Sequence, residues 1–254
     1  MAKDLELAME LADIARGMAI DRFRASDLEV ERKPDGSPVS DADQAIERAL
    51  RDRLAAERPS HAITGEEFGS SGESDWRWYL DPIDGTQSYV DGGEDWKVLI
   101  ALVYTDRPVV AVVDGPSESS RWWAVLGEGA FHDGRRMFAS AVGTLAEATV
   151  SDNWHHVLAS GDTDHPLARL APLCGHVRPY QGDTFLALAA GELDVAVGLD
   201  GFAWDYAPYL LIVDEAGGRF TDYSGRSRFD AREALASNGA LHTEALQVVG
   251  GPGR

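Results

Sequence analysis

The stretch Trp78-Tyr79-Leu80-Asp81-Pro82-Ile83-Asp84-Gly85-Thr86 decides the fold and the function that we expect of this chain. Its apolar first part predicts a buried strand that ends at Leu80, on the edge where open α/β sheets bind their ligands. Pro82 has no backbone N–H, so we expect the chain to leave the strand ladder there. Asp81 and Asp84 would then lie together on a tight bend beyond the strand.

The Gly85-Thr86 pair that follows adds two backbone N–H groups, which the start of a helix would direct toward an anion. Two carboxylates beside such a cradle indicate a divalent metal ion that acts together with phosphate. An Asp-Pro turn closed by aspartate side chains explains the same residues without any chemistry. From this stretch alone, both interpretations stay open.

The overall composition limits the classes of function. With 254 residues the chain is long enough for one large α/β domain or for two halves around a shared cleft, and we expect halves at residues 1–145 and 146–254. The 43 acidic and 23 basic residues give a net charge of −20, which argues strongly against binding to nucleic acid. That charge also repels phosphate esters, so an acidic phosphatase needs metal ions to reverse the local field.

Neither a membrane segment nor an exported protein is predicted. No apolar run approaches the roughly 20 residues needed to cross a bilayer. The first residues, Met1-Ala2-Lys3-Asp4-Leu5-Glu6, lack the order of a signal peptide. The single cysteine, Cys174, excludes a disulfide framework and a cysteine-rich zinc site. We therefore expect a cytoplasmic protein.

Three aspartates each begin a predicted helix. Asp43 forms a capping box with Ser40, and Asp183 precedes a short apolar helix as its N-cap. Asp205 is an acid in a first helical turn, because Pro208 can be tolerated only near a helix start. Each of these residues thus has a sufficient structural explanation by itself.

Four acids nevertheless share a position at a predicted strand end or helix start, and such edges converge in an α/β sheet. They are Glu66, Asp81, Asp84 and Asp205. Without a counter-charge this cluster is strongly destabilising, and its oxygen ligands select Mg²⁺ or Mn²⁺ over zinc. Two ions ~3.5–4 Å apart could activate water and hold both ends of an in-line phosphoryl displacement. The chain has no P-loop and no nucleophile motif, and His155-His156 is better explained as part of a loop than as a metal site.

Three motifs in this order resemble the inositol monophosphatase family, and the resemblance runs from the first helix almost to the C-terminus. They are Gly65-Glu66-Glu67, Asp81-Pro82-Ile83-Asp84-Gly85-Thr86, and Trp204-Asp205 followed by Glu215-Ala216-Gly217-Gly218. The chain is most similar to the bacterial histidinol-phosphatase branch. The residues that support this branch are 33–43, Gly65-Glu66-Glu67-Phe68-Gly69, Arg121-Trp122-Trp123-Ala124 and Gly182-Asp183.

The resemblance implies a layered αβαβα sandwich, a homodimer and a lithium-sensitive, Mg²⁺-dependent phosphatase. The implied partner is a small phosphorylated metabolite, and we prefer L-histidinol phosphate, a compound of histidine biosynthesis. The alternative is an inositol phosphate or another cyclitol or sugar phosphate. A binding protein that keeps the fold without catalysis is the remaining class, and the intact set of metal ligands argues against it.

The resemblance also implies the metal ligands. The first ion would be held by Glu66, Asp81 and the carbonyl of Ile83, and its water would attack phosphorus. The second ion would be held by Asp81, Asp84 and Asp205, and it would stabilise the leaving oxygen. A third, weaker ion would also bind Glu66, and Mn²⁺ could replace Mg²⁺.

The catalytic and phosphate-binding roles follow from the same resemblance. Thr86, polarised by Asp43, would orient the attacking water and help to deprotonate it, with Glu66 acting on the same water through its metal. The N–H groups of Gly85 and Thr86 would bind the phosphate. On the substrate side, Asp183, Asp200 or Glu94 could pair with a cationic amine of the leaving group, beside Asp205.

Three departures from the family concern the leaving group. Gly198 stands where family members carry an acid that recognises the substrate, and Asp200 nearby could replace it. The segment from residue 87 to residue 95 is unusually acidic. Tyr206 and Pro208 replace residues that are ordinarily small and favourable to a helix.

Overall fold

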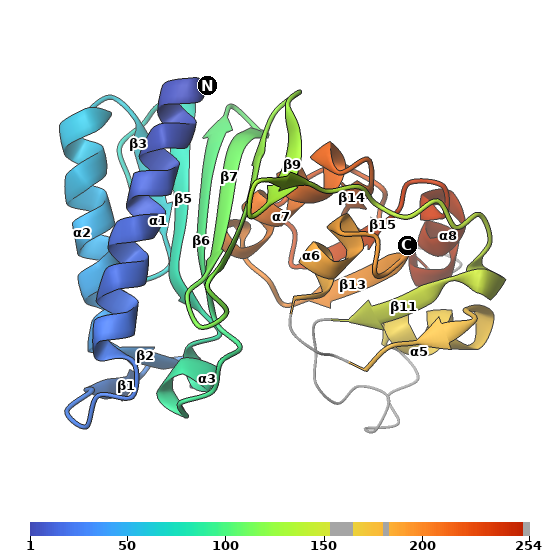
Figure 1. Cartoon of the computed structure of the whole chain (residues 1–254), viewed down its shortest axis with the longest axis horizontal. Helices are drawn as coiled ribbons and strands as arrows, with labels where there is room; N and C mark the ends of the chain where they lie inside the picture. The colour runs from blue at the N-terminus through green and yellow to red at the C-terminus, as the bar shows by residue number, and fades with distance from the viewer. Residues whose placement is uncertain (153–164, 180–182, 251–254) are drawn as a thin grey trace. The chain divides into compact units, whose positions relative to one another are not determined.

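The computed structural model describes residues 1–152, 165–179 and 183–250, so that the pair His155-His156 lies outside the described residues. The chain divides into two compact units, Met1–Leu126 and Gly127–Arg254. Each unit combines a sheet with helices (Figure 1), which confirms the α/β class predicted from the sequence. No described helix is long and apolar enough to cross a lipid bilayer.

The first unit is built on a sheet in which the strands follow the order β8-β7-β6-β5-β3-β4. Their bounds are β3 (Ala62–Gly65), β4 (Gly69–Ser71), β5 (Trp76–Asp84), β6 (Lys97–Tyr104), β7 (Arg107–Gly115) and β8 (Ser120–Val125). Among these strands, β3 and β5 are parallel neighbours, and the other neighbours are antiparallel. The long apolar runs of β6 and β7 are buried at nearly every position.

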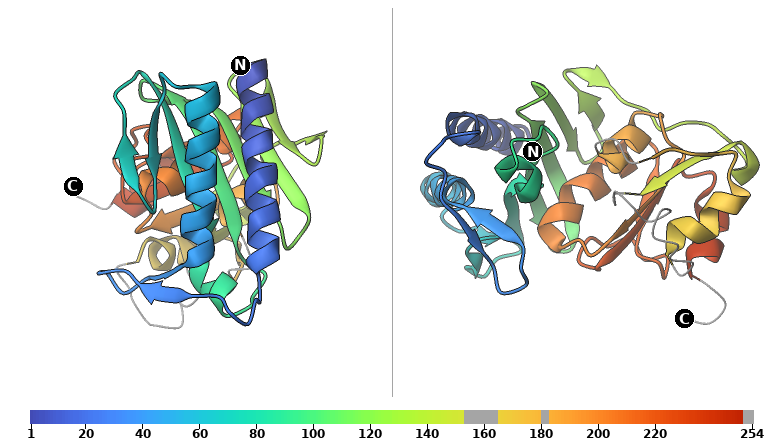
Figure 2. Two further views of the ribbon diagram at one scale, coloured as in Figure 1. Left: turned by 90° about the vertical axis from the view of Figure 1, so that its left-hand side faces the viewer. Right: turned by 90° about the horizontal axis from the view of Figure 1, so that it is seen from below.

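Two helices, α1 (Ala2–Arg22) and α2 (Asp41–Glu57), lie side by side over one face of this sheet (Figure 2). Apolar side chains that recur every three or four positions, such as Leu11 on α1 and Ile46 and Leu50 on α2, are fully buried. They pack in one core with Trp78 and Ile100 of the sheet. This core fixes the first turn of α2 relative to the end of β5.

Three short elements lie around the Asp-Pro stretch. The strands β1 (Val30–Arg32) and β2 (Pro38–Ser40) pair on either side of residues 33–37, and β2 leads directly into α2. The helix α3 (Thr86–Val90) begins where a helix was expected and packs against β2. The end of β5 and the start of α2 are thereby joined through α3 and β2.

The prediction that the strand ends at Leu80 and leaves the ladder at Pro82 is wrong. β5 continues to Asp84, with Asp81 opposite Leu99 and Asp84 opposite Lys97 on β6. Three steps along β5 therefore match two steps along β6, so one extra residue is accommodated in a β-bulge. The bulge accommodates Pro82, which has no N–H to give to the ladder.

The second unit contains a five-stranded sheet in the order β12-β11-β13-β15-β14. Its strands, together with a preceding hairpin, are β9 (Gly129–His132), β10 (Arg135–Arg136), β11 (Thr149–Asp152), β12 (His176–Val177), β13 (Val195–Leu199), β14 (Arg219–Thr221) and β15 (Glu233–Ser237). Its helices are η1 (Leu145–Glu147), α5 (Pro166–Leu170), η2 (Ala171–Leu173), α6 (Thr184–Ala189), α7 (Ala203–Glu215) and α8 (His242–Gly250).

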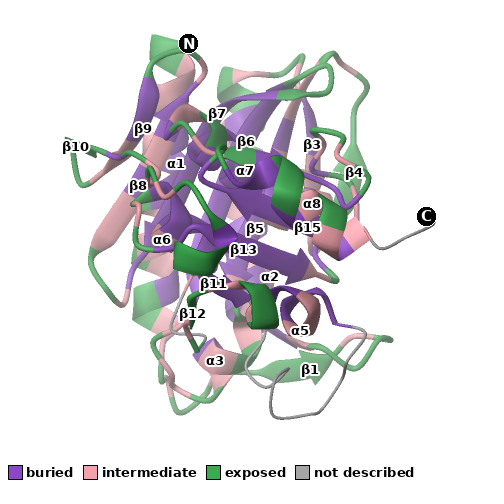
Figure 3. Cartoon of the chain, turned by 90° about the vertical axis from the view of Figure 1, so that its right-hand side faces the viewer, coloured by how far each residue is buried: buried purple, intermediate pink, exposed green. Residues whose placement is uncertain are grey.

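Helices cover both faces of this second sheet. Val195 and Val197 of β13 belong to an apolar cluster that includes residues of α5 and α8. Gly198 follows Val197 on the strand, so its Cβ position is on the opposite face of the sheet, against Phe185 of α6 and Tyr206 of α7. Figure 3 shows β13 and β15 as mostly buried strands between these helices.

The division between the units falls after Leu126, whereas the sequence led us to expect halves that meet at residue 145. The backbone N–H groups of Gly127 and Gly129 each donate to the Glu215 carboxylate over 2.8 Å. These two bonds tie the β9–β10 hairpin to the end of α7, which explains why it groups with the second unit.

The start of α7 also differs from the expectation. The helix begins at Ala203, with Phe202 as its N-cap, so Pro208 lies in the second turn and not in the first. The missing N–H of Pro208 removes the helical hydrogen bond that the Trp204 carbonyl would otherwise accept.

Candidate active site

Glu66 and the Asp81–Thr86 stretch lie at the same edge of the first sheet. β3 and β5 run parallel with Gly65 opposite Leu80, and the Glu66 N–H donates to the Leu80 carbonyl over 3.1 Å. Since the carboxyl ends of parallel strands meet at one sheet edge, Glu66 lies beside the bulge that carries Asp81.

Inside the bulge, polar groups bind one another. Asp81 is 2% exposed, and its Oδ1 accepts the N–H of Ile83 over 3.1 Å. The Ile83 carbonyl lies 3.0 Å from the Thr86 hydroxyl, which donates to it. Asp84, at the end of the bulge, is half-buried. A carboxylate, a carbonyl and a hydroxyl are thus held in one short segment.

Asp43 connects this segment to α2. It is fully buried, and its Oδ2 accepts the backbone N–H and the hydroxyl of Ser40 over 2.8 and 2.5 Å, which confirms the predicted capping box. Its Oδ1 lies 3.3 Å from the Thr86 hydroxyl. Since that hydroxyl has one proton and two acceptors, Asp43 and Ile83 share it.

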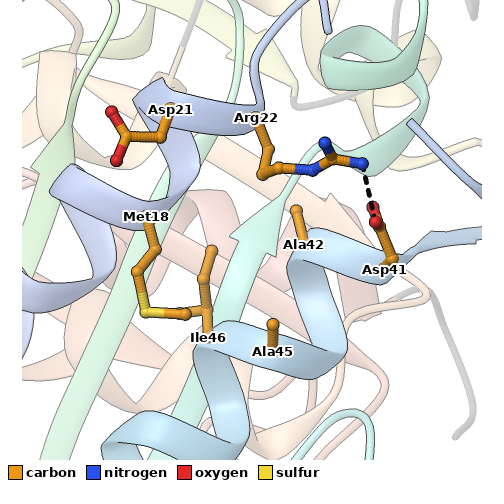
Figure 4. Close-up of a pocket in the computed structure, with 7 residues that line it drawn as sticks. All are labelled: Met18, Asp21, Arg22, Asp41, Ala42, Ala45 and Ile46. Atoms are coloured by element: carbon orange, nitrogen blue, oxygen red, sulfur yellow. Dashed lines mark hydrogen bonds and ion pairs between the residues drawn. The ribbon is translucent and has the colours of Figure 1, made fainter. Parts of the chain in front are cut away.

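An ion pair with α1 also fixes the start of α2. Arg22 of α1 donates to Asp41 over 2.7 Å beside a pocket between the two helices (Figure 4). Asp41 is the first residue of α2, two positions before Asp43. The ion pair therefore joins the first turn of α2 to the end of α1.

Burial raises the pKa of Asp43 to about 6, although its hydrogen bonds with Ser40 oppose this shift. The charge of Glu66 raises the pKa of Asp43 further. Two acids that the sequence proposed for one site thus repel each other through space. Such repulsion is the condition that a divalent cation would relieve.

Lys33 supplies the positive charge beside the glutamates. Its ammonium donates to Glu66 Oε1 over 2.7 Å and to Glu67 Oε1 over 2.8 Å. Burial lowers the pKa of Lys33, but the bonds to both glutamates outweigh it and raise that pKa above its usual value. Burial raises the pKa of Glu67 to about 7, against the effect of Lys33.

The donor chemistry of the first-unit residues fits a hard divalent ion. Carboxylates of Glu66, Asp81 and Asp84 and the Ile83 carbonyl offer oxygen ligands, and no sulfur or imidazole group is proposed among them. In the part of the chain that the structure describes, no three His, Cys, Asp or Glu side chains gather closely enough to hold a metal ion. The Lys33 ammonium lies 2.7 Å from Glu66 Oε1 and supplies positive charge there.

The proposed phosphate cradle begins at Gly85. This residue is the N-cap of α3 and has a φ of 85°, a left-handed conformation that favours glycine. A Cβ atom here would lie 2.7 Å from the Asp95 carbonyl oxygen, so the close approach of the two segments also requires glycine. Thr86 is the first residue of α3.

Three predicted site residues lie in the second unit, each at the start of a helix or on a turn. Asp205 Oδ2 accepts the N–H of Phe202 over 2.7 Å at the start of α7. Asp183 caps α6 by accepting two backbone N–H groups, which confirms its predicted structural role. Asp200 has a φ of 58°, and its Oδ1 lies 3.7 Å from Arg232 Nη2.

The surroundings of Gly198 explain why no acid stands there. A Cβ atom at this position would lie 2.9 Å from Phe185 Cζ and 2.9 Å from the Tyr206 hydroxyl oxygen. The Tyr206 hydroxyl accepts the N–H of Gly201 over 3.2 Å. The unusual Tyr206 therefore occupies the space that a side chain at residue 198 would need.

Two residues that contact this site were not predicted from the sequence. Lys33 was named only within the segment 33–43 that supports the resemblance, and its contact with Glu66 depends on the β1–β2 hairpin. Glu47 was not considered, yet it is fully buried and bonds to the backbone after Glu66. Its spacing of four residues from Asp43 places both acids on one face of α2, which is the signal that could have identified it.

Known proteins are similar to this chain over nearly its whole length. The model of the inositol monophosphatase family matches residues 1–250. A histidinol-phosphatase of Streptomyces coelicolor is 40% identical and covers 96% of this chain and 95% of its own length. One of Mycobacterium tuberculosis is 39% identical and covers 96% of each. A solved structure of an inositol monophosphatase from Zymomonas mobilis is 30% identical, with a TM-score of 0.82 and 98% of both chains covered.

Proposed function

This chain belongs to the inositol monophosphatase family, and on that premise we propose that it is a Mg²⁺-dependent phosphatase that hydrolyses L-histidinol phosphate to L-histidinol and phosphate. The family and its histidinol-phosphatase relatives confirm the phosphomonoesterase class predicted from the sequence. The observation that carries the mechanism is the set of contacts that joins Asp43, Thr86, Ile83 and Asp81 at one sheet edge.

Two metal ions, and a third bound more weakly, would take oxygen ligands from this chain. Glu66, Asp81 and the Ile83 carbonyl would hold the first ion, and Asp81, Asp84 and Asp205 the second. When bound, such ions supply an activated water and stabilise negative charge on the phosphate and on the leaving oxygen. Mg²⁺ suits these ligands, and Mn²⁺ is the alternative.

Residues of the chain would orient the reacting groups. The Thr86 hydroxyl donates to Asp43. Its oxygen would accept a proton from the attacking water while its own proton passes to the Asp43 carboxylate, so that Thr86 ends as a neutral hydroxyl. A pKa of about 6 suits Asp43 for taking up a proton near neutral pH. The N–H groups of Gly85 and Thr86, at the start of α3, would bind phosphate oxygens.

The choice of L-histidinol phosphate rests on relatives and on charge. Two relatives about 40% identical are histidinol-phosphatases, and a net charge of −20 favours a leaving group that carries an amine. Asp183 already accepts two N–H groups of α6, and a side chain at Gly198 is excluded by its neighbours. Asp200, whose side chain is exposed, is therefore our first choice for pairing with the amine, and Glu94 is the second.

The alternative substrate is an inositol phosphate or another cyclitol or sugar phosphate. It is favoured by the 30% identity to the inositol monophosphatase of known structure. Gly198 does not separate the two substrates, because the resemblance implies an acid at this position for both. By the same family argument, we propose a homodimer that lithium inhibits.

Phosphate release from a panel of esters tests this proposal. The purified protein is assayed with L-histidinol phosphate, inositol 1-phosphate and a sugar phosphate, each with millimolar Mg²⁺ and with EDTA. We expect Mg²⁺-dependent release that is fastest with L-histidinol phosphate. Equal rates on the first two esters would remove the substrate preference, and release that persists in EDTA would refute the metal-dependent mechanism.

A further inference from the structure

We propose that Glu47 is a positioning residue for Glu66, an inference that rests on the proposed function because it takes Glu66 as a metal ligand. Glu47 lies on α2, one turn after Asp43, and is fully buried. Its carboxylate is directed toward the hairpin between β3 and β4, which carries Glu66 at its first loop position.

The loop of this hairpin consists of Glu66, Glu67 and Phe68, because Gly65 pairs with Gly69. The N–H of Glu66 donates to the Leu80 carbonyl over 3.1 Å. The N–H of Glu67 donates to Glu47 Oε2 over 2.7 Å, and the N–H of Phe68 donates to Glu47 Oε1 over 3.2 Å. All three backbone donors of the loop thus have fixed partners, and Glu47 provides two of them.

The glycine before Glu66 is explained by the same contact. A Cβ atom on Gly65 would lie 2.2 Å from Glu47 Oε1 and 2.4 Å from its Cδ. Such distances are far below van der Waals contact, so the carboxylate can approach the loop only because residue 65 has no side chain. Gly65 and Glu47 therefore form a matched pair.

Arg51 compensates the buried charge of Glu47. Its Nε donates to Glu47 Oε1 over 2.7 Å, one turn further along α2. The same guanidinium donates to the Gly69 carbonyl and, over 3.0 Å, to the Ser71 hydroxyl on β4. A buried carboxylate with a charged partner and two backbone donors holds a fixed orientation.

The backbone on which Glu66 is carried is therefore fixed from two sides, by β5 through Leu80 and by α2 through Glu47. The Glu66 side chain itself bonds to Lys33 and not to Glu47, so Glu47 acts through the backbone. Loss of a residue that orients a metal ligand typically weakens metal affinity by ~10–100-fold. We expect this size of effect from weakening the two bonds of Glu47.

The test compares Glu47→Gln with Glu57→Gln. Glu57 lies at the end of the same helix and is also ion-paired, with Arg53 at 2.6 Å, but it is well exposed and bonds to no loop of the site. Mg²⁺ affinity is measured by calorimetry without substrate, alongside the Mg²⁺ dependence of phosphate release and the melting temperature in EDTA. We expect Glu47→Gln to weaken Mg²⁺ binding at least tenfold while it still folds in EDTA, and Glu57→Gln to leave that affinity unchanged.

A second variant approaches the contact from the loop. Gly65→Ala should displace the Glu47 carboxylate and weaken Mg²⁺ binding similarly, which keeps the test decisive if Glu47→Gln does not fold. In a Glu66→Gln background, Glu47→Gln should weaken Mg²⁺ binding little further, because the ligand that it positions is already lost.

Two results would overturn the inference, and they are distinguishable. If the unaltered protein binds Mg²⁺ and releases phosphate while Glu47→Gln only lowers the melting temperature, Glu47 is structural and the proposed function stands. If the unaltered protein neither binds Mg²⁺ nor releases phosphate, the proposed function fails and the role of Glu47 fails with it.

Discussion

Replacing Asp43 by asparagine is expected to remove most of the activity and, at neutral pH, to make the protein more stable. Asp43 is fully buried, and its two oxygens bond to Ser40 and to Thr86. Burial, assisted by the charge of Glu66, raises its pKa from 3.8 to about 6. Asparagine keeps the shape and one acceptor oxygen but carries no charge.

The sign and size of the stability effect follow from this pKa. Between about pH 3.8 and 6 the folded protein binds more protons than the unfolded chain, so stability falls as the pH rises through this range. At pH 7 the full cost is present, roughly 3 kcal/mol at 1.36 kcal/mol per pH unit. Asparagine removes this cost, and with its oxygen kept toward both Ser40 donors it loses the bond from the Thr86 hydroxyl, worth about 1–2 kcal/mol. We expect a net gain of about 1–2 kcal/mol at pH 7 and no gain near pH 4.

Urea unfolding in EDTA at pH 7 and near pH 4 measures the stability, and phosphate release measures the activity. Loss of a positioned proton acceptor should slow release by ~10²–10⁴-fold. The matched control is Asp41→Asn, which removes an ion pair with Arg22 on a side chain that is 37% exposed. This control should change the free energy of unfolding by less than about 1 kcal/mol and should retain its phosphatase activity. The reasoning is refuted if Asp43→Asn is less stable than the unaltered protein at pH 7, or if it keeps more than a tenth of the activity.

Three further predictions concern other parts of the chain. Asp84→Asn should abolish phosphate release without changing the circular dichroism spectrum, and near-normal release would exclude Asp84 as a metal ligand. Gly198→Asp should destabilise the protein by about 1–3 kcal/mol in denaturant, because its Cβ would lie 2.9 Å from Phe185 and Tyr206. Burial lowers the pKa of His242 from 6.5 to about 4, so stability should be lost as the pH falls through this range, and His242→Gln should flatten that part of the urea-unfolding profile.

Local patterns predicted most of the fold. The capping box at Ser40, the N-cap at Asp183 and the helix start after Gly85 are each decided by a few neighbouring residues, and all three are present. The errors at Pro82 and Pro208 have one cause. A missing N–H was taken to end or begin an element, but a bulge in β5 and a single lost bond in α7 accommodate the two prolines.

The candidate site was predictable only where sequence motifs carry it. Glu66 follows β3 and Asp81 lies near the end of β5, and the parallel pairing of these strands brings the two acids to one edge. Lys33 and Glu47 act on Glu66 from a hairpin and from the helix α2, and no local pattern contains both them and Glu66. Contacts between distant segments, which depend on how helices pack on a sheet, are therefore the part that the motifs do not contain.

The residues on the substrate side show the same limit of prediction from sequence motifs. The absence of an acid at Gly198 can be noticed in the sequence, but its reason lies in α6 and α7, where Phe185 and Tyr206 fill the space. Because Tyr206 directly follows Asp205, one substitution beside a proposed metal ligand can change the surroundings of the leaving group without altering that ligand. A change in the preferred ester therefore requires no change in the proposed metal ligands, and this is why the motifs indicate the reaction more firmly than the substrate.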